Sequence, residues 1–260
     1  MKLDKRSPLK DRPLRNPGQS VDERLLDLVL DKVLGPPMVA LLLCVLAGLE
    51  WWRYYFPQPP NPIIYSLMAL LAVSYAAFQI WRTWPQLMAL RLGRDGEKVV
   101  GQLLEQLRKD GYQVFHDLVG NGFNVDHVLI GSTGLFTIET KTFSKRSSPD
   151  AKVIFDGERI VVDGFEPDRN PVIQAKLQAA WMREVLAEST GRKFSVRPVI
   201  LFPGWWVEQS KGSKREIWVL EPKALRAFLA HEPAVLAAED VTLASSHLAS
   251  FIRANESRIN

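Results

Sequence analysis

Two long runs of apolar residues near the start of the chain place the strongest limit on its fold. The first covers residues 36–52 and has no charged residue before Glu50, and the second covers residues 62–81 and has none. A helix of about 20 residues rises about 30 Å, the thickness of the hydrocarbon core of a bilayer. The sequence therefore predicts a transmembrane helical hairpin over residues 36–81. Buried core helices of a soluble protein are the alternative interpretation.

The short turn between the two runs and the charges around them predict the orientation of the hairpin. Residues 53–61 carry one basic residue, Arg53, beside aromatic residues that suit the membrane interface. Eight Lys or Arg precede the first run, and Arg82, Arg91 and Arg94 follow the second. Because basic residues accumulate on the cytoplasmic side, we expect a two-pass protein of a bacterial-type inner membrane with both termini in the cytoplasm.

Outside these runs the sequence predicts an N-terminal tail and one soluble domain. The tail, residues 1–35, contains a capping box from Ser20 to Glu23 and then apolar residues at helical spacing, which predicts a short amphipathic helix at the membrane surface. Residues 91–260 mix charged and apolar residues as a cytoplasmic domain does. The single cysteine, Cys44, excludes an intrachain disulfide and a Cys-based zinc site. A net charge of +4 permits an acidic partner without identifying one.

The soluble domain begins with a predicted helix and three predicted strands. Apolar residues recur at helical period over residues 95–110, and Gly111 follows as a C-terminal cap. Extended segments with glycine-rich turns between them follow at 112–118, 123–130 and 135–142. The later predicted elements are a hairpin at 152–155 and 159–162, a helix at 174–187, strands at 196–202 and 216–220, and helices at 222–231 and 241–254. This order predicts an α/β fold.

Charged side chains occur on faces of these elements that are otherwise apolar. Glu97 shares the inward face of its helix with Val100. Asp126 lies on an apolar face of the second strand, and Glu139 and Lys141 share a face of the third, because strand side chains alternate. Two carboxylates and an ammonium on neighbouring strands suit a hydrolytic site with a hard cation. Ordinary salt-bridged or solvated residues are the alternative interpretation.

Four segments of the domain carry a resemblance to a known family. They are Gly93–Glu97, Asn124–Gly131, Gly134–Lys141 and Asn170–Gln174. In order and spacing they resemble the nuclease-related domain (NERD) family of the PD-(D/E)XK nuclease superfamily, over roughly residues 93–205. The resemblance implies a restriction-endonuclease-like core of a helix, a three-stranded meander, a helix and a strand.

The resemblance also implies a role for each matched residue. Asp126 and Glu139 would bind Mg²⁺ or Mn²⁺, and Lys141 would orient or deprotonate the attacking water. Glu97 would be an accessory acid, and Gln174 would lie beside the metal site. The implied activity is metal-dependent hydrolysis of nucleic-acid phosphodiester bonds, with DNA favoured as substrate and the bilayer as anchor. A catalytically silent nucleic-acid-binding domain, or a protein scaffold at the membrane, is the alternative.

Residues outside the family motifs add candidate nucleic-acid contacts. The basic candidates for phosphate contacts are Lys145, Arg146, Lys211, Lys214 and Arg215. Trp205 and Trp206 could add a stacking surface, although solvated loops explain these residues equally well. His127 is adjacent to Asp126 but points to the opposite strand face, so we expect a structural role for it.

Overall fold

The computed structural model describes residues 15–56, 62–120, 122–145, 151–209 and 216–259. The chain forms two compact units. Residues Ser20–Leu92 form one unit, and Met1–Gln19 together with Gly93–Asn260 form the other. The boundary at Leu92 lies within the long helix α3 (Pro62–Gln106).

The first unit is helical. Helix α1 (Gln19–Leu28) continues through a π-helical stretch (Val29–Leu34) into α2 (Gly35–Tyr55). Pro36 and Pro37 occupy the first turn of α2, where a missing N–H costs no helical hydrogen bond. Two helical stretches, Gln19–Tyr55 and Pro62–Asp110, are long and apolar enough to cross a membrane.

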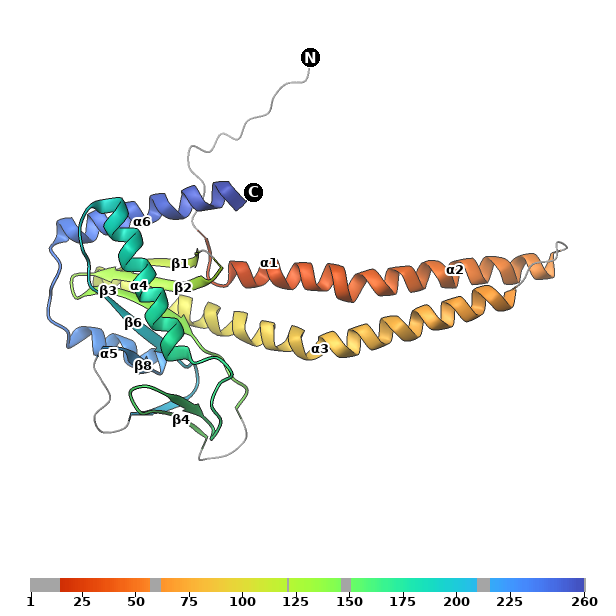
Figure 1. The fold of residues 1–260 in the computed structure, drawn as a ribbon, viewed down its shortest axis with the longest axis horizontal. Helices are drawn as coiled ribbons and strands as arrows, with labels where there is room; N and C mark the ends of the chain where they lie inside the picture. Colours follow the sequence, from red (N-terminus) through yellow and green to blue (C-terminus); the bar gives the residue numbers. More distant parts are fainter. Residues whose placement is uncertain (1–14, 57–61, 121, 146–150, 210–215, 260) are drawn as a thin grey trace, which may run out of the picture. The chain divides into compact units, whose positions relative to one another are not determined.

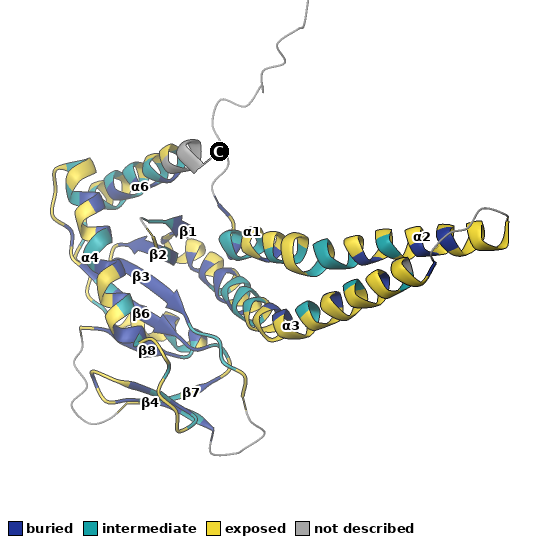
Figure 2. Ribbon diagram, turned by 45° about the vertical axis from the view of Figure 1, so that its right-hand side comes forward, coloured by how far each residue is buried: buried dark blue, intermediate teal, exposed yellow. Residues whose placement is uncertain are grey.

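Most residues of the long helices in this unit are exposed (Figure 2), and many of the exposed residues are large and apolar. The buried alanines, each spaced seven residues from another on its helix, are Ala40, Ala47, Ala69 and Ala76. Trp51 Nε1 on α2 donates a hydrogen bond to Ser66 Oγ on α3 at 2.9 Å. Outward-facing Leu42 and Leu70 are 58% and 62% exposed. Small interior residues with an apolar exterior are typical of helices that pack within lipid.

The second unit contains a five-stranded sheet with the order β1-β2-β3-β6-β8 (Figure 1). Its strands are β1 (Gln113–Val119), β2 (Asn124–Gly131), β3 (Gly134–Thr140), β6 (Val196–Leu201) and β8 (Trp218–Leu220). The first three form an antiparallel meander, whereas β3, β6 and β8 are parallel. The α/β class and the meander predicted from the sequence are confirmed.

Helices cover both faces of this sheet. The C-terminal part of α3, a 3₁₀ turn (Leu107–Asp110) and α5 (Leu225–Ala230, after a 3₁₀ turn at Pro222–Ala224) pack on one face. Helices α4 (Pro171–Thr190) and α6 (Ala238–Ile259) pack on the other. Neighbouring residues such as Val128 and Leu129 therefore enter different cores. Gly111 ends the α3 region with φ +89° and is the cap that the sequence predicted, because glycine tolerates this left-handed conformation.

A smaller sheet with the order β5-β4-β7 packs beside the start of α4. Its strands are β4 (Lys152–Phe155), β5 (Ile160–Val162) and β7 (Trp206–Gln209). The hairpin of β4 and β5 was predicted, but β7 was not. All four β7 residues are at least partly exposed, so this strand lacks the buried apolar alternation that identifies a strand in a sequence.

Candidate active site

The end of β3 brings the predicted acidic residues together. The pairing of His127 with Ile138 places Asp126 of β2 opposite Glu139 of β3. The backbone N–H of Thr140 donates to Asp126 Oδ2 at 2.6 Å, which fixes this carboxylate across the strand pair. The register of the two strands therefore brings the two predicted acids together.

The carboxylate of Glu139 is buried and held by three side chains. Its Oε1 accepts from Gln174 Nε2 at 2.7 Å and lies 2.6 Å from Lys141 Nζ. Its Oε2 accepts from Gln178 Nε2 at 2.5 Å. Lys141 Nζ also donates to Gln174 Oε1 at 2.9 Å, so Lys141, Gln174 and Glu139 form a closed ring of contacts. Only 4% of Glu139 is exposed, whereas the Lys141 side chain is 23% exposed and reaches solvent.

A third acid, Glu97, acts electrostatically on Asp126 in this cluster. Burial raises the pKa of Asp126 well above its usual range, and the negative charges of Glu139 and Glu97 raise it further. The Thr140 N–H and the ammonium of Lys141 oppose this rise of the Asp126 pKa. The cluster therefore has more acidic than basic groups, which favours proton or cation binding.

A close approach between α3 and the chain after β3 positions Glu97. A Cβ on Gly96 would lie 2.0 Å from Thr142 Oγ1, a distance that no side chain can occupy. Glycine at residue 96 therefore lets the helix touch Thr142, two residues beyond Thr140. On its other side, Glu97 contacts the segment that precedes α1: a Cβ added to Gly18 would lie 3.5 Å from Glu97 Oε2.

The start of α4 brings both glutamines to Glu139. Asn170 caps this helix by accepting from the Val172 N–H at 2.9 Å, and Pro171 occupies its first turn. The helix begins three residues before the predicted start at residue 174 and extends beyond the predicted end at residue 187. Gln174 and Gln178 are one turn apart and therefore share the face toward β3.

Gln178 was not predicted as a site residue. It is 1% exposed and donates to the Asn124 carbonyl at 2.8 Å as well as to Glu139. The available signal was its position four residues after Gln174 on a predicted helix.

Comparison with known proteins relates the part of the chain that carries this cluster to a protein family. A family model described as the nuclease-related domain matches residues 92–203. Residues 92–203 thus match the nuclease-related domain family, and we call this part of the chain the nuclease-related domain. An uncharacterized protein of Bacillus anthracis is 36% identical over 56 residues, which are 20% of this chain and 26% of that protein. The match thus spans about a quarter of that relative. No solved structure matches the chain.

The donor atoms of the nuclease-related domain suit a hard divalent cation, with a limited set of protein ligands. Asp126 and Glu139 supply carboxylate oxygens, which Mg²⁺ and Mn²⁺ prefer. Within the described ranges, no three His, Cys, Asp or Glu side chains converge closely enough to hold an ion by themselves. An ion at this position would therefore combine the two carboxylates with water or substrate oxygens, as Mg²⁺ commonly does.

The predicted nucleic-acid contacts are only partly within the described chain. Lys145 Nζ lies 5.5 Å from the centroid of the Trp205 ring. Trp205 is 2% exposed, so the prediction that it offers a stacking surface was wrong, because it belongs to the core beside α4. Trp206, on β7, is 72% exposed. The other basic candidates lie outside the described residues: Arg146, Lys211, Lys214 and Arg215.

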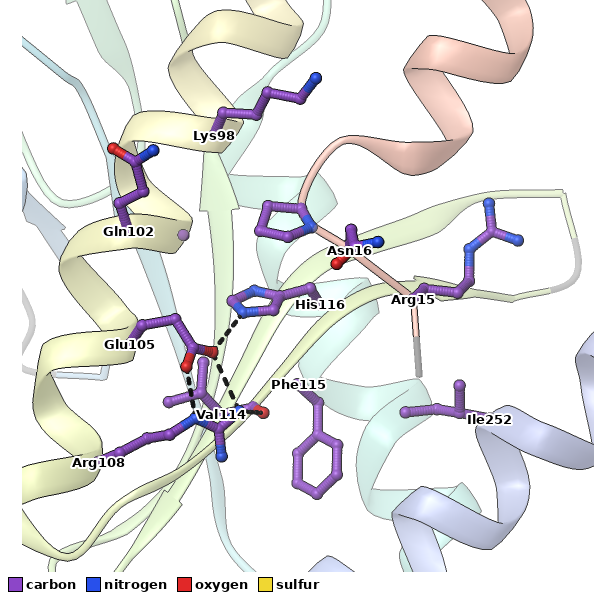
Figure 3. A pocket seen from close by; sticks show the side chains of 12 residues that line it. Arg15, Asn16, Lys98, Gln102, Glu105, Arg108, Val114, Phe115, His116 and Ile252 are labelled. Atoms are coloured by element: carbon purple, nitrogen blue, oxygen red, sulfur yellow. Dashed lines mark hydrogen bonds and ion pairs between the residues drawn. The ribbon is translucent and has the colours of Figure 1, made fainter. Parts of the chain in front are cut away.

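A cavity of about 510 Å³ lies on the α3 side of the sheet and is lined in part by His116, Glu105 and Lys98 (Figure 3). His116 Nε2 is 2.8 Å from Glu105 Oε1, and His116 Nδ1 is 2.8 Å from His127 Nδ1. Burial lowers the pKa of His116, although Glu105 opposes this effect, and burial lowers the pKa of His127 well below its usual range. His127 is 0% exposed, on the face opposite to Asp126, and its contact with His116 links it to Glu105 of α3.

The segment before α1 lines the same cavity. Arg15 Nε forms an ion pair with Asp117 Oδ2 at 2.8 Å, and both side chains are almost fully buried. Pro17 packs against Gly101, where a Cβ would lie 2.5 Å from the proline ring. The segment from Arg15 to Gly18 is therefore docked on the nuclease-related domain close to Glu97.

Proposed function

We propose that the chain is a membrane-anchored nuclease whose nuclease-related domain hydrolyses nucleic-acid phosphodiester bonds with a divalent metal ion, DNA being the favoured substrate. The cluster of Asp126, Glu139 and Lys141 carries the proposal. It combines two partly or fully buried carboxylates with an ammonium that reaches solvent. An ordinary surface salt bridge does not require this burial.

The contacts of Lys141 support a role in acting on water or phosphate. Two of its N–H groups are directed to Glu139 Oε1 and Gln174 Oε1, at 2.6 and 2.9 Å. An ammonium has three donors, so one remains for a water molecule or a phosphate oxygen. Because Glu139 and Gln174 fix the ammonium, Lys141 would orient the attacking water toward the scissile phosphate.

Asp126 and Glu139 would hold Mg²⁺ or Mn²⁺, with Glu97 nearby as an accessory acid. Repulsion among the carboxylates, which contributes to the raised pKa of Asp126, is the situation that a divalent cation relieves. A bound ion would neutralise charge on the phosphate and lower the pKa of a coordinated water. Gln174 and Gln178 would hold Glu139 in place by their hydrogen bonds to its two oxygens.

The membrane anchor would consist of α2 and the N-terminal half of α3. Their outward-facing surface is rich in large exposed apolar residues, which water solvates poorly and lipid covers. The excess of Lys and Arg outside the hairpin supports a two-pass arrangement with both termini in the cytoplasm.

One observation favours a second candidate function, a nucleic-acid-binding domain without useful catalysis. Both oxygens of Glu139 already accept hydrogen bonds from amide groups. If these contacts were retained in every state, Glu139 would have less capacity to bind a metal ion. The close approach of Asp126 and Glu139 favours the nuclease, because a binding domain gains nothing from carboxylates that repel one another.

The test is cleavage of labelled single- and double-stranded DNA and RNA by the full chain in detergent, with Mg²⁺, Mn²⁺ or EDTA. Glu139→Ala and Lys141→Ala are compared with Glu184→Ala and Lys109→Ala, which remove the same charges from exposed positions. We expect metal-dependent cleavage that only the first two variants lose. Binding without cleavage of any substrate would favour the second candidate.

A further inference from the structure

A second hollow, of about 740 Å³, lies between α4 and the beginning of β6. Lys176 and Arg183 line it from the helix, Ser195 and Arg197 line it from the strand side, and Glu216 lies at its border. Among the described lining residues, Glu216 is the one acid against three cations. The hollow therefore carries excess positive charge.

The two helical cations, Lys176 and Arg183, have no ion pair within the described ranges. The residues three and four positions away on α4 are all apolar, so the helix supplies no acid to either cation. Other basic residues of the domain differ: Arg108 pairs with Glu105, and Arg226 pairs with Asp110. Both helical cations are exposed and available to an external anion.

Arg197 makes a smaller contribution to the charge of the hollow. Its guanidinium stacks 4.6 Å from the centroid of the Trp218 ring, and its Nη1 lies 2.9 Å from Glu232 Oε1. These contacts fix its position and balance its charge. Lys176 and Arg183 therefore supply most of the unbalanced charge.

The spacing of the two cations suits a chain of phosphates. They are seven residues apart on α4, which corresponds to about 10.5 Å along the helix axis. Phosphates of one strand repeat along the duplex axis at about 3.4 Å, so the two cations are far enough apart to contact different phosphates of one strand. Lys176 is two residues from Gln174, so the hollow begins at the level of the active site along the axis of α4 but on another face of that helix.

We propose that this hollow binds the phosphate backbone of the nucleic acid outside the scissile bond, through Lys176 and Arg183. The inference rests on the proposed function, because it assigns a binding surface to the same substrate. A bilayer surface is a less suitable ligand, because a hollow bordered by β6 and Glu216 admits a single extended chain better than a flat layer of headgroups.

The test measures binding separately from cleavage. The full chain in detergent is titrated into a fluorescein-labelled 20-mer of single-stranded or duplex DNA in EDTA, at several salt concentrations. The double variant Lys176→Ala/Arg183→Ala is compared with Lys109→Ala/Lys223→Ala, which removes the same charge from exposed positions elsewhere in the domain. The logarithm of the association constant falls linearly with the logarithm of the salt concentration, and each lost phosphate contact makes this negative slope shallower by about 1. We expect the slope to become shallower by about 2 in Lys176→Ala/Arg183→Ala and to remain almost unchanged in Lys109→Ala/Lys223→Ala.

Each other outcome contradicts the inference. An equal change of slope in the two double variants would mean that DNA binding depends on the net charge of the protein and not on this hollow. An unchanged slope in Lys176→Ala/Arg183→Ala would exclude the hollow, and it would leave the proposed nuclease intact if cleavage still required Lys141. No binding of DNA by the unmodified chain would contradict both the inference and the DNA preference of the proposed function.

Discussion

Replacing Gln178 by leucine tests how Glu139 is held. Leucine is similar in volume to glutamine, so Gln178→Leu removes hydrogen bonds without opening a large cavity. Two bonds are lost, one to the Glu139 carboxylate and one to the Asn124 carbonyl, at 2.5 and 2.8 Å. A bond to a charged group contributes about 1.5–3 kcal/mol and a neutral bond about 0.5–1.5 kcal/mol. The gross loss is then about 2–4.5 kcal/mol.

Part of this loss is offset, because Gln178 Oε1 is buried without a hydrogen-bond partner among the described residues. Removing an unsatisfied polar atom recovers about 1–3 kcal/mol, so at the middle of both ranges the expected net cost is about 1 kcal/mol. For a domain of this size that corresponds to a decrease in Tm of about 2–4 °C. Because Glu139 Oε2 loses its donor, we also expect slower cleavage.

The assay is thermal unfolding of the full chain, followed by tryptophan fluorescence, together with metal-dependent DNA cleavage. Gln102→Leu is the control, because Gln102 is exposed on α3. An unchanged Tm and an unchanged cleavage rate in Gln178→Leu would refute the argument that Gln178 holds the carboxylate.

Three further predictions concern other parts of the domain. Asp117→Asn keeps a residue that tolerates φ +50° but leaves Arg15 without its buried partner, so residues 16–19 should exchange amide hydrogens at least about tenfold faster; an unchanged exchange rate would contradict this. Gly96→Ala should abolish cleavage by displacing α3, and Thr142→Ala in the same chain should restore part of it, since the clash is with Oγ1; no rescue would argue against this cause. The lowered pKa of His116 means that its contribution to stability is present above its ordinary pKa of about 6.5 and is lost as the pH falls below that value. His116→Gln should therefore reduce the decrease in unfolding free energy between pH 7 and 5, measured by urea titration, and an unchanged decrease would be inconsistent with this.

The sequence was sufficient to predict the meander and the cluster on it. Alternation predicts that Glu139 and Lys141 share a face of β3, and the glycine-rich turns predict that β2 and β3 are antiparallel neighbours. The register of β2 with β3 then brings Asp126 opposite Glu139. The same pattern predicts the opposite orientation of His127, which the fold places among the residues packed by α3.

Features that depend on tertiary contacts were not predicted from the sequence. Gln178 is a polar residue in a helix interior, and only packing against Glu139 distinguishes it from a solvated glutamine. The continuity of α3 from Pro62 to Gln106 was also not predicted, since Pro85 and the charged residues after it interrupt the apolar pattern. The docking of Arg15 on Asp117 joins residues 102 positions apart in sequence, and no local pattern indicates it.

The central claim is that Lys141 acts in phosphodiester hydrolysis beside two carboxylates. Its most direct test is the single-turnover rate of Mg²⁺-dependent DNA cleavage by the full chain, by Lys141→Met and by Lys109→Met. A group that orients or deprotonates water contributes about 100-fold or more, so Lys141→Met should be slower by at least that factor, while Lys109→Met retains the rate of the unmodified chain. Cleavage by Lys141→Met at the rate of Lys109→Met would contradict the account.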